Sequence, residues 1–134
     1  MSTPPILHTQ ALTRRFGGLT AVNQVDIQIQ AGELIGLIGP NGAGKTTLFN
    51  LLMGLIKPSA GEVYLHGQRI TGFKPHQVAR LGMVKTFQNV ALFPEMSVLD
   101  NVLTGGLLRL SLGEARELAR HNLARVGMSH IADK

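Results

Sequence analysis

A glycine-rich segment of this chain carries the residues best suited to chemistry. It fits the pattern G-x-x-x-x-G-K-S/T, with its fixed positions at Gly39, Gly44, Lys45 and Thr46. Glycines let a backbone wrap closely around phosphate oxygens, and successive N–H groups form a nest that binds anions. The spacing therefore predicts a loop that binds the phosphates of a nucleotide. The predicted binding residues are Gly39, Asn41, Gly42, Ala43, Gly44, Lys45, Thr46 and Thr47.

Two side chains of this loop bring specific chemistry. Lys45 supplies a positive charge for the β- and γ-phosphates, and the Thr46 hydroxyl can bind Mg²⁺. We expect the Lys45 side chain to face solvent when no ligand is bound. The loop alone does not separate a kinase, a GTPase and a transport ATPase. The base-reading motif N-K-x-D that is typical of GTPases does not occur in the sequence.

Two elements must hold the loop in place. The continuous apolar run of residues 34–38 predicts a strand that is covered on both faces. Apolar residues at Leu48, Leu51, Leu52 and Leu55 follow the spacing of a helix that begins near Lys45. A buried strand before the loop and an amphipathic helix after it are the context that this motif requires.

The remaining elements complete an α/β pattern. A hairpin turn is predicted at His66-Gly67, and a break in the second strand at Gln24-Val25. The last helix is expected to turn Ala115, Leu118, Ala119, Leu123 and Val126 toward one face. Further strands are predicted over residues 6–12, 22–29, 62–65, 68–70 and 83–87, and further helices over 75–81, from 97, and over 113–126.

Composition excludes several classes of protein. With 44% hydrophobic and 16% charged residues, the chain is too apolar for a disordered tail. The net charge is +5, but the basic residues are scattered and no aromatic residues alternate with them, so we expect no nucleic-acid partner. The absence of cysteine excludes thiol catalysis, and the five histidines lack metal-ligand spacing, so no metal cluster is expected. Residues 48–56 form the longest nearly apolar run, far below the roughly 20 residues of a membrane span.

The glycine-rich loop resembles the Walker A motif of ABC transporter nucleotide-binding domains. In that family an aromatic residue upstream of the loop stacks on adenine, and Phe16 stands at this place, 23 residues before Gly39. The segment Thr86-Phe87-Gln88-Asn89 resembles the family's Q-loop. The resemblance assigns Gln88 to contact with Mg²⁺ and with the attacking water. It implies ATP and Mg²⁺ as ligands.

Within this family the chain is most similar to the LivG-type ATPases of branched-chain amino acid import. The supporting segments are residues 16–22, 48–50 and 79–90. The resemblance implies a transport-coupled ATPase that is peripheral to the cytoplasmic face of the inner membrane. Its expected partners are membrane permease subunits and a second nucleotide-binding subunit. ATPases for urea or short amides, or for lipopolysaccharide export, remain alternatives, as does a catalytically inactive nucleotide-binding fragment.

Family members also carry an LSGGQ-type signature and a Walker B strand, and neither is found in this sequence. The segment Leu110–Arg116 looks like a signature, but it begins only 22 residues after Gln88, and Ser111 and Glu114 fit a helix capping box. We therefore expect a P-loop NTPase core with an antiparallel β subdomain over residues 1–96. The start of a helical subdomain is expected over residues 97–134, with the chain truncated before the signature and inactive in hydrolysis by itself.

Overall fold

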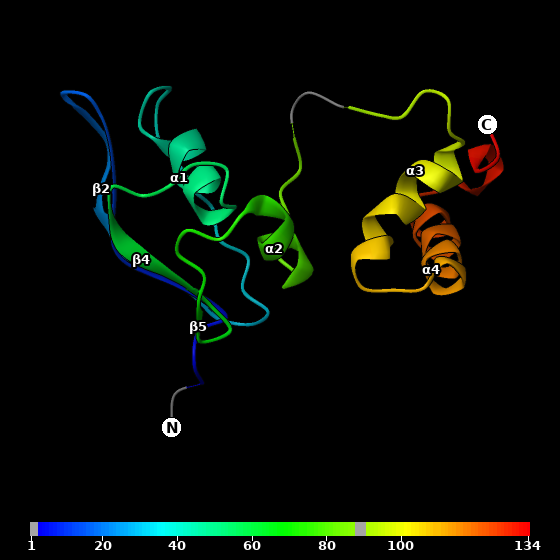
Figure 1. Ribbon diagram of the computed structural model, residues 1–134, viewed down its shortest axis with the longest axis horizontal. Helices are drawn as coiled ribbons and strands as arrows, with labels where there is room; N and C mark the ends of the chain where they lie inside the picture. Colours follow the sequence, from blue (N-terminus) through cyan, green and yellow to red (C-terminus); the bar gives the residue numbers. More distant parts are fainter. Residues whose placement is uncertain (1–2, 88–90) are drawn as a thin grey trace. The chain divides into compact units, whose positions relative to one another are not determined.

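The computed structural model describes residues 3–87 and 91–134, which form two compact units (Figure 1). The first unit ends at Lys85 and the second begins at Thr86. The first contains the strands and the glycine-rich loop, and the regular elements described in the second are helices. No helix among the described residues is long and apolar enough to cross a membrane.

An antiparallel sheet organises the first unit. Its central strand β1 pairs with β2, with β3 and with β4, and β4 pairs in turn with β5. The β1–β2 hairpin closes where Phe16 pairs with Leu19. Its turn contains Gly17, which has φ +59°. The strands are β1 (Leu7–Phe16), β2 (Leu19–Val25), β3 (Gln28–Ile29), β4 (Ala60–Leu65) and β5 (Gln68–Arg69).

The predicted turns of this sheet are confirmed. The strand expected over residues 22–29 is interrupted where β2 ends at Val25, and Gln24 has φ +47°. His66 and Gly67 connect β4 to β5, and both have positive φ, as a tight two-residue hairpin turn requires. The strand expected over 6–12 is extended to Phe16.

Helix α1 (Lys45–Leu52) packs against the sheet. Its buried residues Leu48, Leu51 and Leu52 share one apolar core with Leu12 and Val63. Helix α2 (Pro75–Arg80) begins with proline, ends before Gly82, and adds the buried Val78 to the same core. Both helices were predicted from spacing and end signals. The core holds α1, and with it the end of the glycine-rich loop.

Two predicted strands are wrong. Residues 34–38 and 83–87 are not in strands, and Leu34 and Ile38 are 99% and 97% exposed. A strand that is covered on both faces needs neighbouring strands for its backbone groups. Within the described part of the chain, the sheet's strands pair only with one another. An apolar run predicts a segment that prefers burial, but it does not supply the pairing partner.

The second unit is a small helical assembly. Leu99 and Leu103 pack against Ala115, Ala119 and Leu123. Leu118 and Val126, which we expected on the same face, are exposed, so this expectation is wrong. The packed stripe of α4 is therefore narrower than the apolar pattern predicts. The elements are α3 (Val98–Thr104), the 3-10 helix η1 (Gly105–Leu108), α4 (Leu112–Arg125) and the 3-10 helix η2 (Ser129–Ile131).

Candidate nucleotide-binding site

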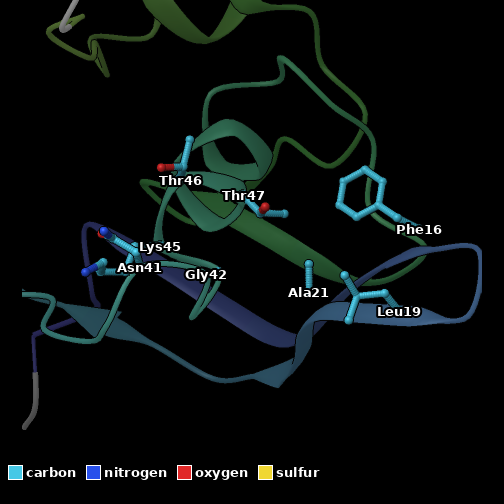
Figure 2. A pocket seen from close by; sticks show the side chains of 9 residues that line it. Phe16, Leu19, Ala21, Asn41, Gly42, Lys45, Thr46 and Thr47 are labelled. Carbon is cyan, nitrogen blue, oxygen red and sulfur yellow. The ribbon is translucent and has the colours of Figure 1, made fainter.

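The glycine-rich loop and the β1–β2 hairpin enclose a cavity of about 350 Å³ in the first unit (Figure 2). Figure 2 shows Lys45 and Asn41 toward one end of it, and Phe16 with Leu19 toward the other. The cavity therefore joins a cationic end to an aromatic end. Its lining consists of Phe16, Leu19, Ala21, Asn41, Gly42, Gly44, Lys45, Thr46 and Thr47.

The shape of the loop depends on glycine at its junction with α1. Gly44 has φ +94°, and a Cβ atom there would lie 2.2 Å from the Ala21 carbonyl oxygen. Neither the conformation nor the space admits a side chain. Gly44 is also the N-cap of α1 and provides no side-chain cap. The first N–H groups of the helix therefore stay open to a ligand, as anion binding at a helix N-terminus requires.

Lys45 lines the cavity, and its side chain faces solvent only in part, so our expectation holds in part. It is half-buried, and its Nζ donates a hydrogen bond to the Gly39 carbonyl oxygen. An ammonium group has only donors, and the loop itself presents a strong acceptor to it. The Ala43 N–H donates to the Pro40 carbonyl over 3.1 Å and tightens the same turn. The loop thus holds its own cation at the place where phosphate charge would be neutralised.

The first turn of α1 brings two hydroxyl groups to the cavity. Thr46 is exposed and Thr47 is half-buried, and both line the cavity. A hydroxyl oxygen is the kind of hard ligand that Mg²⁺ prefers, and this ion commonly keeps several waters and phosphate oxygens as its other ligands. No acidic side chain is among the described residues that line the cavity. Its charge therefore suits a polyanion.

Phe16 closes the aromatic end of the cavity. It is the last residue of β1, it is 44% exposed, and Leu19 lies opposite it in the β1–β2 register. An exposed aromatic ring at the edge of a cavity offers a π face on which a planar base can stack. The sheet core fixes the strand that carries this ring, because Leu12 and Thr13 of the same strand are fully buried.

The structure brings most of the predicted site residues together. Ala43 does not line the main cavity but lines an adjoining hollow of about 290 Å³. Gly39 contributes the carbonyl oxygen that accepts the hydrogen bond from Lys45. Gln88 lies outside the described residues.

Sequence reasoning missed Leu19 and Ala21 as lining residues. The turn glycines after Phe16 are the signal that would have found them, because a tight hairpin folds Leu19 back onto Phe16.

Comparison with known proteins decides the family. The model of the family described as "ABC transporter" matches residues 22–134. This chain belongs to the ABC transporter ATPase family. Members of the family bind nucleotide and are ATPases, and the predicted α/β fold class is confirmed.

Curated members of the ABC transporter family share high sequence identity with this chain. It is 42% identical to the high-affinity branched-chain amino acid transport ATP-binding protein BraF of Pseudomonas aeruginosa, and covers 57% of that protein. It is 43% identical to the protein LivG of Escherichia coli K12, which bears the same description, and covers 51% of it. Both alignments include 97% of this chain. The chain thus spans about half the length of these relatives.

A solved structure supports the same assignment for this ABC chain. The ADP conformation of MJ1267, described as an ATP-binding cassette of an ABC transporter, superposes with a TM-score of 0.84 and 32% sequence identity. The superposition covers 98% of this chain and 57% of that protein. An ATP-binding cassette in its ADP conformation therefore shares the fold of this chain.

Proposed function

We propose that this chain is the nucleotide-binding part of an ATPase subunit that drives the import of branched-chain amino acids. One observation carries the proposal: Lys45, the open N-terminus of α1 and the exposed ring of Phe16 border a single cavity. A nucleotide offers a polyanion at one end and a planar base at the other, which matches the two ends of this cavity.

Each residue has a distinct role in binding ATP. The backbone N–H groups of residues 41, 42 and 44–47 surround the phosphates, and the amine of Lys45 leaves the Gly39 carbonyl to bind the β- and γ-phosphates. Thr46 presents its hydroxyl to Mg²⁺, which when bound neutralises phosphate charge. Phe16 stacks on adenine. Gly42, with φ +87°, and Gly44 keep the backbone close enough for these contacts.

Hydrolysis requires more groups than the cavity supplies. Gln88 is proposed to orient the attacking water and to contact Mg²⁺, as the family resemblance implies. No carboxylate lines the cavity within the described ranges, so no general base is in reach of bound phosphate there. We infer that turnover depends on further parts of the ATPase, including the signature of a second nucleotide-binding subunit.

The relatives support a proposal for the cellular setting. The names of BraF and LivG describe branched-chain amino acid transport ATP-binding proteins. We propose that this subunit is peripheral to the cytoplasmic face of the inner membrane and binds permease subunits there. The substrate assignment rests on these relatives, since the described cavity suits a nucleotide and not an amino acid.

Uptake measurements test the transport proposal. The gene is deleted in its own host, and uptake of labelled leucine, isoleucine and valine is compared with uptake of urea and of acetamide. The proposal predicts loss of high-affinity uptake for the three amino acids and normal uptake of urea and acetamide. A defect in urea or amide uptake, or in lipopolysaccharide at the cell surface, with normal leucine uptake would contradict it.

A further inference from the structure

We propose that Arg14 is a positioning residue for the base of the bound nucleotide, acting through the ring of Phe16. The proposal rests on the proposed function, because it assigns a new role beside the same site. Arg14 precedes Phe16 by two residues on β1, and its guanidinium carbon lies 4.6 Å from the centroid of the Phe16 ring. A cation over an aromatic face at this distance is attracted by the ring's electrons.

A hydrogen bond to the backbone holds the Arg14 guanidinium in place. Its Nη1 donates a hydrogen bond of 2.7 Å to the carbonyl oxygen of Lys57. The following segment is tied to the same end of β1, since the Ser59 N–H donates to the Thr13 carbonyl over 2.8 Å and the Ser59 Oγ accepts from the Arg15 N–H over 2.9 Å. Arg14 is therefore held by a fixed backbone, and it holds the ring in turn.

Arg14 contacts the Phe16 ring without lining the cavity. Phe16 lines the cavity, whereas Arg14 is not among its lining residues. In the proposed role the guanidinium covers one face of the ring, and the base stacks on the other face. Arg14 is half-buried, and its Nε is buried without a hydrogen-bond partner among the described residues. Reduced access of water strengthens the attraction between the cation and the ring.

The arrangement prepares the ring before the nucleotide arrives. A phenylalanine has no hydroxyl group with which to fix its orientation, so an exposed ring would otherwise sample several rotamers. A cation on the outer face limits this motion and draws electron density away from the inner face, which reduces repulsion against the base. The contribution of Arg14 should therefore be specific to ligands that carry a base.

The experiment compares two ligands in calorimetry: MgATP, and magnesium tripolyphosphate, which has no base. Arg14→Met removes the charge but keeps a long apolar side chain, and Arg14→Lys restores a cation. Arg15→Met is the matched control, because it removes the same charge from an exposed neighbour. The Arg14→Met change is also made in a Phe16→Ala background, which forms a double-mutant cycle. Thermal unfolding of each variant shows that it is folded.

We expect Arg14→Met to weaken MgATP binding by about threefold to tenfold, with tripolyphosphate affinity unchanged. Arg14→Lys should recover part of the lost MgATP affinity, and Arg15→Met should bind MgATP as the parent does. In the Phe16→Ala background, Arg14→Met should cause no further loss of MgATP affinity.

Equal losses for both ligands, a loss that persists in the Phe16→Ala background, or no loss at all would overturn the role of Arg14. If Phe16→Ala weakens MgATP binding and Arg14→Met does not, only this inference fails. If the parent chain binds neither ligand, the proposed nucleotide site fails and the role of Arg14 with it.

Discussion

Lys45 and the Gly39 carbonyl form an interaction that a bound phosphate must replace. The amine is already satisfied inside the loop, and phosphate oxygens compete for it as stronger, charged acceptors. Because the exchange replaces one hydrogen bond by another, the loop reaches its binding conformation without exposing an unpaired cation.

Gly44 should be the least replaceable residue of the loop. Gly44→Ala places a Cβ atom 2.2 Å from the Ala21 carbonyl at φ +94°, so the loop or β2 must shift. We expect a loss of about 1–3 kcal/mol in the free energy of unfolding, measured by denaturant titration, together with loss of MgATP binding.

Gly36→Ala is the control for this substitution. A Cβ atom at Gly36 meets nothing within 4 Å, and its φ is outside the left-handed region. Its unfolding free energy should stay within about 0.5 kcal/mol of the parent. Equal effects of the two substitutions would contradict the close approach at Gly44.

Helix α4 begins with a serine cap, and this element bears on how Leu110–Arg116 is interpreted. The Ser111 Oγ accepts from the Glu114 N–H over 3.3 Å and donates to the Glu114 carboxylate over 2.7 Å. Ser97 caps α3 in the same way through the Asp100 N–H at 3.0 Å. The capping hydrogen bonds explain why serine occupies position 111. A role in a nucleotide-binding signature is not needed to account for it.

We therefore expect Ser111→Ala to lower the free energy of unfolding by about 1 kcal/mol, and Ser97→Ala to do the same. Ser129→Ala, at an exposed serine that is not an N-cap, is the control and should change it little. In an assembled transporter the ATPase rate of Ser111→Ala should follow this stability loss alone. A collapse of turnover in a fully folded variant would restore the signature interpretation.

We expect the β4–β5 hairpin to contribute a pH-dependent part of the stability. The Thr71 hydroxyl, and after it the Arg69 guanidinium at 2.7 Å, hold the pKa of Glu62 below its usual value of 4.5. Because the folded state favours the carboxylate, this stabilisation is present above the unfolded pKa and is lost as pH falls through the lowered folded pKa.

Glu62→Gln should therefore be less stable than the parent near neutral pH, and the difference should shrink as pH falls below about 4.5. Urea unfolding of both proteins between neutral and acidic pH measures this. A difference that is independent of pH would show that the Glu62 carboxylate contributes no linked stability.

Local signals predicted the elements that local interactions determine. Proline at the first position of α2, Ser97 and Ser111 before their helices, and the His66-Gly67 turn each act within a few residues, and each is confirmed. The strands expected over residues 34–38 and 83–87 depend on distant pairing partners, which an apolar run does not specify. The roles of Phe16 and Gln88 came from resemblance to a family, because neither residue type signals a nucleotide by itself.

At the scale of the whole chain, binding and hydrolysis should be separable. Residues 1–134 are expected to bind MgATP without turning it over, because no described acidic residue lines the cavity to act as a base. Loss of a general base alone costs about 10²–10⁴ in rate. Phosphate release from the purified chain measures this, with Lys45→Ala to reveal any contaminating ATPase. Turnover near ~1 s⁻¹ that depends on Lys45 would contradict the expectation.

Calorimetric titration of MgATP into the parent chain and into Lys45→Ala tests the central claim most directly. Charge-assisted hydrogen bonds contribute about 1.5–3 kcal/mol each, so the variant should bind roughly tenfold to a hundredfold more weakly. Lys134→Ala, which removes the same charge from an exposed site in the second unit, should bind as the parent does. Equal MgATP affinity of the parent and Lys45→Ala would contradict the nucleotide site proposed for this loop.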